Sequence, residues 1–223
     1  MIKYKCLVLD HDDTVVDSTA SIHFPCFVEY LSKYRPALAD SYTTESYFIK
    51  NFDPGIVSLL RDEVGLSAEE LAHEEEYWRD YVRSHLPRAY DGIKETCERF
   101  LSEGGILAVV SHSFTSYIER DYEHNGLPTP HRIYGWDSSP ERRKPAPYAL
   151  FDLMKTYKLD PCEILVVDDL KPGLEMARAA GVDFAAAGWG YDIPEIERAM
   201  RESCAHYLKT VKELELLLFG GTE

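Results

Sequence analysis

Short apolar runs that stop at a polar or glycine-containing turn recur along the chain and predict buried parallel strands. Four such runs are clear, at residues 4–9, 106–110, 164–167 and 183–187, and a weaker fifth covers residues 132–135. Helical patterns lie between them at 93–102, 147–157 and 174–180, the last closed by Gly181. This alternation predicts an α/β fold with a doubly wound, mainly parallel Rossmann-like sheet and helices on both faces.

Residues 16–88 interrupt that alternation. The segment contains no strand-like run, and amphipathic helical patterns cover residues 26–34 and 68–85. It carries 7 basic and 13 acidic side chains, which gives it a net charge of −6. We therefore expect a separate all-helical insert at 16–88, with an α/β core built from residues 1–15 and 89–223.

Composition and charge restrict the class of protein. Of the 223 residues 45% are hydrophobic, enough for a sizeable core, and 24 Lys plus Arg oppose 39 Asp plus Glu for a net charge of −15. That charge disfavours nucleic acid and anionic membranes, which are bound through clustered positive charge. No signal-peptide pattern precedes Asp10, and the longest uncharged stretch, 104–118, is shorter than the roughly 18 residues that span a bilayer. We expect a cytoplasmic protein that binds neither nucleic acid nor a membrane.

Acidic side chains follow two of the predicted strands. Asp10 and Asp12 come directly after the first strand, and Asp168 and Asp169 follow the run at 164–167. Acids there can also serve as turn residues or helix N-caps. Two acidic clusters at strand ends of one sheet, where α/β proteins bind ligands, favour a site instead. Gathered carboxylates need a cation, and hard oxygen ligands select Mg²⁺.

A hydroxyl and an ammonium complete the candidate chemistry. Ser111 and His112 follow the second strand, and a serine hydroxyl at that place can bind a phosphoryl oxygen, although a lone serine is commonly an ordinary turn residue. Lys144 ends the run Arg142-Arg143-Lys144, and the prolines at 145 and 147 stiffen the backbone after it. A cationic run in so acidic a chain supplies the local positive charge that an anionic substrate needs.

The order of these motifs resembles that of the haloacid dehalogenase superfamily. Asp-x-Asp-x-Thr, then Ser, then Lys-Pro, then Asp-Asp follow one another at credible spacing, and residues 8–18, 90–93 and 177–181 are similar to family segments. The resemblance implies a phosphotransferase that uses a covalent aspartyl-phosphate. Because the true dehalogenases of the family lack a second aspartate at the place of Asp12, its presence favours phosphoryl transfer.

Carried over to this sequence, the resemblance assigns a role to each candidate. Asp10 would be the nucleophile, and Asp12 the general acid for the leaving alcohol and then the base for the hydrolytic water. Ser111 and Lys144 would hold the transferring phosphoryl group. This assignment agrees with elementary electrostatics, because a carboxylate attacking a phosphate needs positive charge to offset their repulsion.

The resemblance also implies a Mg²⁺ site and a substrate site. The Asp10 carboxylate, the Asp12 backbone carbonyl and Asp168 would bind the metal, and Asp169 belongs to the same cluster. The substrate, a small phosphorylated metabolite, would contact Thr14, Ser111, His112 and Lys144. The insert at 16–88 corresponds in position to the family's helical cap, which closes over the site and selects the substrate.

Two departures from the family pattern and two alternatives accompany this interpretation. Asp13 stands where the family usually has glycine, and His112 where asparagine is common. A phosphomutase acting on a sugar phosphate would share the first half-reaction, and His23 lies one residue from where mutases place a cap histidine. A non-catalytic phosphate-binding module on the same fold is the other alternative, although such a module would normally lose Asp10 or Asp12.

Overall fold

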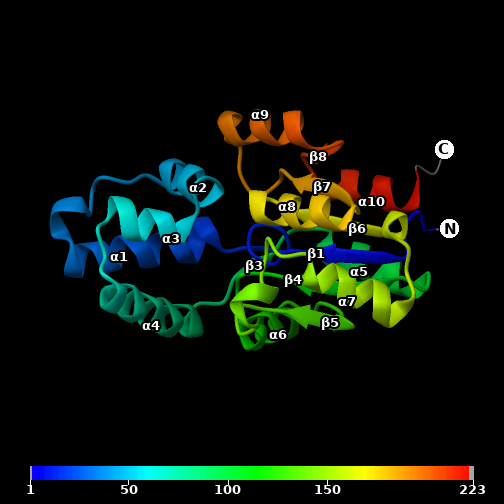
Figure 1. Cartoon of the computed structure of the whole chain (residues 1–223), viewed down its shortest axis with the longest axis horizontal. Coiled ribbons are helices and arrows are strands. Elements are labelled where there is room, and N and C mark those ends of the chain that lie inside the picture. Colours follow the sequence, from blue (N-terminus) through cyan, green and yellow to red (C-terminus); the bar gives the residue numbers. More distant parts are fainter. Residues whose placement is uncertain (1, 221–223) are drawn as a thin grey trace. The chain divides into compact units, whose positions relative to one another are not determined.

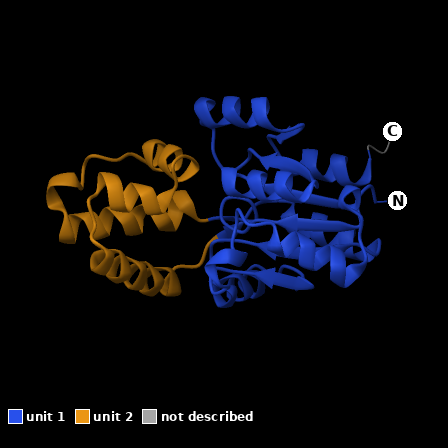
Figure 2. Ribbon diagram, in the orientation of Figure 1, with its two compact units in different colours: residues 1–17, 88–223 blue, residues 18–87 orange. Residues whose placement is uncertain are grey.

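The structure is a computed structural model, and it describes residues 2–220. It divides into two compact units, Met1–Asp17 with Arg88–Glu223 and Ser18–Pro87 (Figure 2). None of the helices within residues 2–220 has both the length and the apolar character needed to cross a bilayer.

The first unit is built on a six-stranded parallel sheet with the order β5-β4-β1-β6-β7-β8, and it confirms the predicted doubly wound fold (Figure 1). The two strands that flank β1 come from distant parts of the chain, and the strand order reverses beside β1. Such a reversal is where α/β sheets bind ligands. The strands are β1 (Cys6–Leu9), β4 (Ile106–Val110), β5 (Arg132–Tyr134), β6 (Ile164–Asp168), β7 (Asp183–Ala187) and β8 (His206–Leu208).

Helices cover both faces of this sheet. One face packs its apolar side chains against α5, α6 and α10, in a core that includes Leu7, Leu9, Phe100, Ile118 and Leu214. Helices α7 and α8 contact each other and lie on the opposite face (Figure 1). The helices of this unit are α5 (Ile93–Ser102), α6 (Thr115–His124), α7 (Tyr148–Tyr157), α8 (Lys171–Ala180), α9 (Pro194–Ser203) and α10 (Val211–Phe219).

The second unit, Ser18–Pro87, consists of helices joined by short loops. Its own core gathers aromatic and aliphatic side chains, among them Phe27, Tyr30, Tyr47 and Leu59. The segments that lead into and out of it, β2 (Val16–Asp17) and β3 (Arg88–Ala89), pair as a short antiparallel ladder. The helices of this unit are α1 (Phe24–Tyr34), α2 (Thr44–Phe52), α3 (Ile56–Ser58) and α4 (Ala68–Ser84), with shorter helical turns at Thr19–His23, Pro36–Leu38 and Leu59–Glu63.

The observed boundaries differ from the sequence prediction at several places. The first strand begins at Cys6 instead of residue 4, and Tyr4 is buried with its hydroxyl donating to Asp183 at 2.7 Å. Helix α8 begins at Lys171, three residues before the predicted start, because Pro172 is acceptable in a first helical turn. Gly181 closes this helix with a φ of 71°, as predicted. Strand β8 and helices α6, α9 and α10 were not predicted.

Candidate functional site

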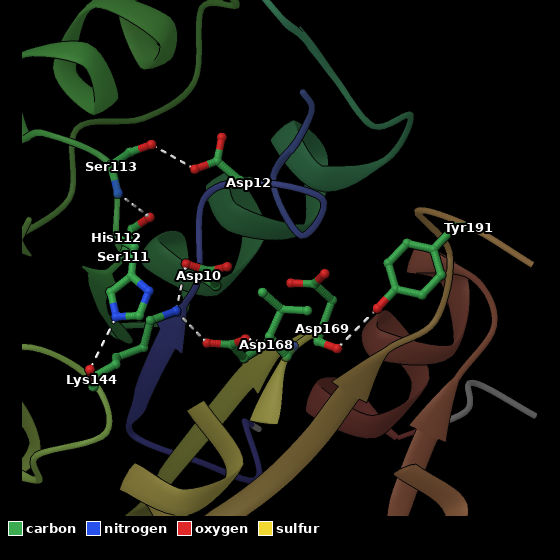
Figure 3. Close-up of polar contacts among 10 residues, drawn as sticks. Asp10, Asp12, Ser111, His112, Ser113, Lys144, Asp168, Asp169 and Tyr191 are labelled. Carbon is green, nitrogen blue, oxygen red and sulfur yellow. Dashed lines mark hydrogen bonds and ion pairs between the residues drawn. The ribbon is translucent and has the colours of Figure 1, made fainter. Parts of the chain in front are cut away.

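The carboxyl ends of β1, β4 and β6 bring most of the sequence-predicted residues together (Figure 3). Leu9 pairs with Val109 on one side and Val167 on the other, so the three strands end at the same level. The residues that follow them therefore meet at one edge of the sheet. Asp10, Ser111, Asp168 and Asp169 are all buried there, and Asp12 is half-buried.

Lys144 reaches this edge from a loop and lies between two of the acids. Its Nζ donates to Asp10 Oδ1 at 2.8 Å and to Asp168 Oδ2 at 2.6 Å, and the residue is only 7% exposed. Burial by itself would lower the pKa of Lys144, but the charges of Asp10 and Asp168 outweigh it and raise that pKa above its usual value. The ammonium is therefore a fixed positive charge at the bottom of the site.

The other two cations of the run do not enter the cluster. The Arg142 guanidinium lies over the ring of Tyr148, 4.6 Å from its centroid, and that of Arg143 lies 4.0 Å from the centroid of the Trp136 ring. Such contacts between a guanidinium and an aromatic face are favourable in themselves. Of the three cations in this run, Lys144 therefore supplies the local positive charge that was expected for an anionic substrate.

Three carboxylates form a cluster that fits a divalent cation. Oxygen atoms of Asp10, Asp168 and Asp169 all lie within 4.8 Å of one another. Burial, together with the charge of Asp10, raises the pKa of Asp168 to about 7, and burial with the charge of Asp13 raises that of Asp169. Among the described residues Asp169 Oδ1 is buried and has no hydrogen-bond partner. A single ammonium does not neutralise three acids, and an all-oxygen donor set suits Mg²⁺.

Neither Asp168 nor Asp169 occupies the N-cap position of the following helix, α8. The N-cap residue of α8 is Leu170, which makes no side-chain cap hydrogen bond. Asp168 Oδ1 instead accepts from the backbone N–H of Leu170 at 2.8 Å, and the Asp169 carbonyl accepts from the Tyr191 hydroxyl at 3.0 Å. Leu170, and neither of the two aspartates, is therefore the N-cap residue of α8, although Asp168 does bind a backbone N–H at the start of that helix.

Asp12 is held by a residue that the sequence interpretation did not single out. The Ser113 hydroxyl donates to Asp12 Oδ2 at 2.6 Å, and the Ser113 N–H donates to the Ser111 hydroxyl at 3.1 Å (Figure 3). Ser111 and Ser113 are both 3% exposed. The alternation Ser-x-Ser, which puts two hydroxyls on one side of an extended chain, is the signal that could have identified Ser113.

His112 and Thr14, the other predicted substrate residues, occupy different surroundings. His112 Nε2 lies 3.0 Å from the backbone carbonyl of Lys144, and burial and the Lys144 charge lower the pKa of His112 to about 4. The neutral ring therefore donates to the loop that carries the lysine. Thr14 is fully buried, its hydroxyl lacks a partner among the described residues, and its carbonyl accepts from the Trp189 indole at 3.0 Å.

Asp13 occupies a backbone conformation that explains the family's preference for glycine. Its φ is 54°, in the left-handed region, where aspartate is tolerated better than most residues with a side chain. Its N–H donates to the Val16 carbonyl at 2.8 Å, which closes the turn after β1. Asp13 thus takes up a backbone conformation that glycine adopts without strain.

A family model and curated sequences match this chain. Residues 7–187 match the model of the haloacid dehalogenase-like hydrolases. A phosphoglycolate phosphatase of Vibrio vulnificus is 31% identical over 134 residues, which are 60% of this chain and 57% of that protein. One from Vibrio parahaemolyticus is 26% identical over 84% of this chain and 85% of its own length. The chain thus spans little more than half the length of the Vibrio vulnificus relative that it matches.

Solved structures share the fold. A haloacid dehalogenase-like family hydrolase of Streptococcus pneumoniae superposes with a TM-score of 0.73 at 19% identity. The match covers 95% of this chain and 97% of that one. At this identity the likeness extends to the fold, and the chemistry of the present chain has to be argued from its own residues.

Proposed function

Because this chain belongs to the haloacid dehalogenase-like hydrolase family, we propose that it is a Mg²⁺-dependent phosphatase that acts on a small phosphorylated metabolite through an aspartyl-phosphate. The observation that carries the proposal is the placement of Lys144 against Asp10, with Asp12 two residues further along the chain. A buried ammonium fixed beside a carboxylate nucleophile is the arrangement that attack on an anionic phosphate requires.

Asp10 would attack the phosphorus atom and displace the alcohol of the ester. The carboxylate and the phosphate repel each other, and Lys144, 2.8 Å from Asp10 Oδ1, supplies positive charge where the two approach. Ser111 would donate its hydroxyl hydrogen to a phosphoryl oxygen. His112 would also support the Lys144 loop through the carbonyl of that lysine, and its contact with the substrate stays a prediction.

Asp12 would transfer protons in both half-reactions. It would protonate the leaving alcohol and then remove a proton from the water that hydrolyses the aspartyl-phosphate. The hydrogen bond from the Ser113 hydroxyl keeps Oδ2 of Asp12 in place for this proton transfer. Dividing the hydrolysis into two displacements replaces one difficult step by two easier ones.

The metal site would use Asp10, Asp168 and Asp169, with the Asp12 backbone carbonyl as a further oxygen ligand. A bound Mg²⁺ supplies charge stabilisation for the transferring phosphoryl group. The buried, unpartnered oxygen of Asp169 and the raised pKa values of Asp168 and Asp169 support a cation here. We also propose that the helical unit, Ser18–Pro87, serves as the cap that selects the substrate.

A phosphatase screen tests the proposal. The panel comprises phosphoglycolate, sugar phosphates, nucleoside monophosphates and phosphoamino acids, each with Mg²⁺ and with a chelator. We expect free phosphate from at least one ester, loss of turnover on chelation, and loss of turnover and of acid-stable phosphoenzyme in Asp10→Asn. Turnover that survives chelation or the Asp10→Asn substitution contradicts the mechanism.

Product analysis separates the two alternatives from the proposal. Isomerised ester from a hexose phosphate would identify a phosphomutase, which shares the attack by Asp10 but returns the phosphoryl group to the sugar. No turnover on the whole panel, together with binding of inorganic phosphate that depends on Lys144, would identify a non-catalytic phosphate-binding module.

A further inference from the structure

His11 lies between Asp10 and Asp12 in the chain, yet its side chain does not join the acidic cluster. It is 1% exposed, and its Nε2 lies 3.1 Å from Oδ2 of Asp121, in helix α6. The two residues are 110 positions apart in the sequence. An ionised carboxylate only accepts hydrogen bonds, so His11 Nε2 donates and the ring is fixed in one orientation.

Asp121 is itself fixed by its neighbours. Its other oxygen, Oδ1, accepts from Arg120 Nε at 2.8 Å and from Arg120 Nη2 at 2.7 Å. The ring of Tyr122 stacks on His11 with 6.0 Å between centroids. A buried polar pair of this kind is seldom more stabilising than apolar residues of the same size, so stability alone is a weak explanation for it.

The backbone of His11 anchors the turn that carries Asp12. Its carbonyl accepts from the N–H groups of Val15 at 2.9 Å and Val16 at 3.1 Å. Immediately before α6, the Ser113 hydroxyl donates to the Asp12 side chain at 2.6 Å. The turn is therefore tied to the α6 segment at two points, one on each side of the peptide that joins His11 to Asp12.

We propose that His11 is a positioning residue, and that its bond to Asp121 holds the turn after β1 against α6 so that Asp12 is correctly placed for proton transfer. The proposal rests on the proposed function, in which Asp12 is the general acid and base. A displacement of about 1 Å at a reacting group can cost on the order of 100-fold in rate.

The leaving group of the substrate distinguishes this role from a merely structural one. An alkyl phosphate needs a proton from Asp12 when its alcohol departs, whereas p-nitrophenolate departs without one. Misplacing Asp12 therefore slows formation of the aspartyl-phosphate from an alkyl phosphate far more than from p-nitrophenyl phosphate. A general loss of folded protein slows both esters by the same factor and leaves their ratio unchanged.

His11→Leu removes the donor, and His11→Gln keeps one near the position of Nε2. We expect the Leu variant to lose about 100-fold in single-turnover phosphorylation by an alkyl phosphate and about fivefold or less with p-nitrophenyl phosphate. The Gln variant should keep the wild-type ratio, and Asp121→Leu should reproduce the effect of His11→Leu. Tyr4→Phe is the matched control, because it removes the partly buried hydrogen bond from a buried side chain just before the start of β1.

Equal slowing of both esters in His11→Leu, or a Gln variant as impaired as the Leu variant, would overturn the positioning role. If neither ester phosphorylates the wild-type protein, the proposed function is contradicted, but the positioning role of His11 is not. The positioning role is then read from amide hydrogen exchange at Asp13, Val15 and Val16. We expect His11→Leu to speed exchange there at least tenfold and Tyr4→Phe to leave it unchanged; unaltered exchange in His11→Leu contradicts the role.

Discussion

The ammonium of Lys144 lies 2.8 Å from Oδ1 of Asp10, and this contact joins the loop after β5 to the end of β1. Its second bond, to Asp168, brings in the end of β6. One buried cation thus connects three segments of the core and holds two of its three clustered acids. Both the stability of the folded protein and the charge of its site depend on this lysine.

Replacing Lys144 by Met should destabilise the metal-free protein strongly. Breaking a buried ion pair by removing one partner typically costs about 3–5 kcal/mol, because the remaining charges stay buried without compensation. Urea unfolding at pH 8 measures the loss, and Mg²⁺ should restore part of it. Lys209→Met, which removes a half-exposed partner of Glu197, should cost no more than about 1 kcal/mol. Equal losses in the two variants would contradict this expectation.

Asp169→Asn should make the metal-free protein more stable and its response to Mg²⁺ smaller. The substitution removes a buried carboxylate, one of the three in the cluster, whose Oδ1 has no partner among residues 2–220. A ligand present at about 100 times its Kd stabilises a protein by about 2.7 kcal/mol, and that shift should shrink in the variant. Thermal unfolding with and without Mg²⁺ measures both effects. Asp91→Asn, on an exposed side chain, is the control, and an undiminished Mg²⁺ response in Asp169→Asn would exclude that residue from the site.

Gly173 is the residue whose lack of a side chain leaves room for Asp168. A Cβ at position 173 would lie 2.1 Å from Asp168 Oδ2, so Gly173→Ala has to displace that carboxylate. We expect a loss of about 1–3 kcal/mol in the free energy of unfolding and a weaker Mg²⁺ affinity. Gly105→Ala, which meets the Phe100 ring at 2.3 Å, should lower stability without changing Mg²⁺ affinity. Isothermal titration with Mg²⁺ distinguishes the two variants, and equal affinities would show that Asp168 does not bind the metal.

Glu74, in α4 of the helical unit, should make stability fall as pH rises. Burial, and then the charge of Glu75, raises the pKa of Glu74 from 4.5 to about 7. The folded protein therefore holds this proton more tightly than the unfolded chain. The resulting stabilisation is complete below pH 4.5 and is lost as the pH rises through 7.

Glu74→Gln removes this titration. The difference in free energy of unfolding between the variant and wild type should favour the variant by about 1–3 kcal/mol more at pH 8 than at pH 5. Urea unfolding at both pH values measures this difference. Glu76→Gln, on an exposed neighbour, should show no such difference between the two pH values. A Glu74→Gln variant whose stability relative to wild type is the same at both values would contradict the expectation.

The sequence allowed the central sheet and most of the site to be predicted because both depend on local signals. Buried parallel strands are short apolar runs, and the polar residues that follow such runs must lie at one edge of the sheet. Asp10, Ser111 and Asp168 could be found in this way. Strand β8 (His206–Leu208) could not, because a three-residue edge strand is too short to show a periodic pattern. Helix α9 (Pro194–Ser203) was missed because it buries only Ile196 and Met200, so its apolar stripe is short.

The pairing of His11 with Asp121 was also beyond sequence reasoning. Nothing in the local pattern of either residue indicates a partner 110 positions away. The orientation of His112 toward the Lys144 carbonyl likewise depends on where a loop without regular structure passes. Contacts of this kind follow from tertiary packing, whereas the strand ends follow from the periodicity of the chain.

The contact between Asp10 and Lys144 also has a consequence during translation, because the two residues are 134 positions apart. At roughly 5–20 residues per second, the ribosome adds Lys144 about 7–27 s after Asp10. During that interval the nascent chain carries the aspartates of its first strand end without the ammonium that compensates them. The charge balance of the core is thus completed late in translation, and a chain released before Lys144 keeps its acids uncompensated.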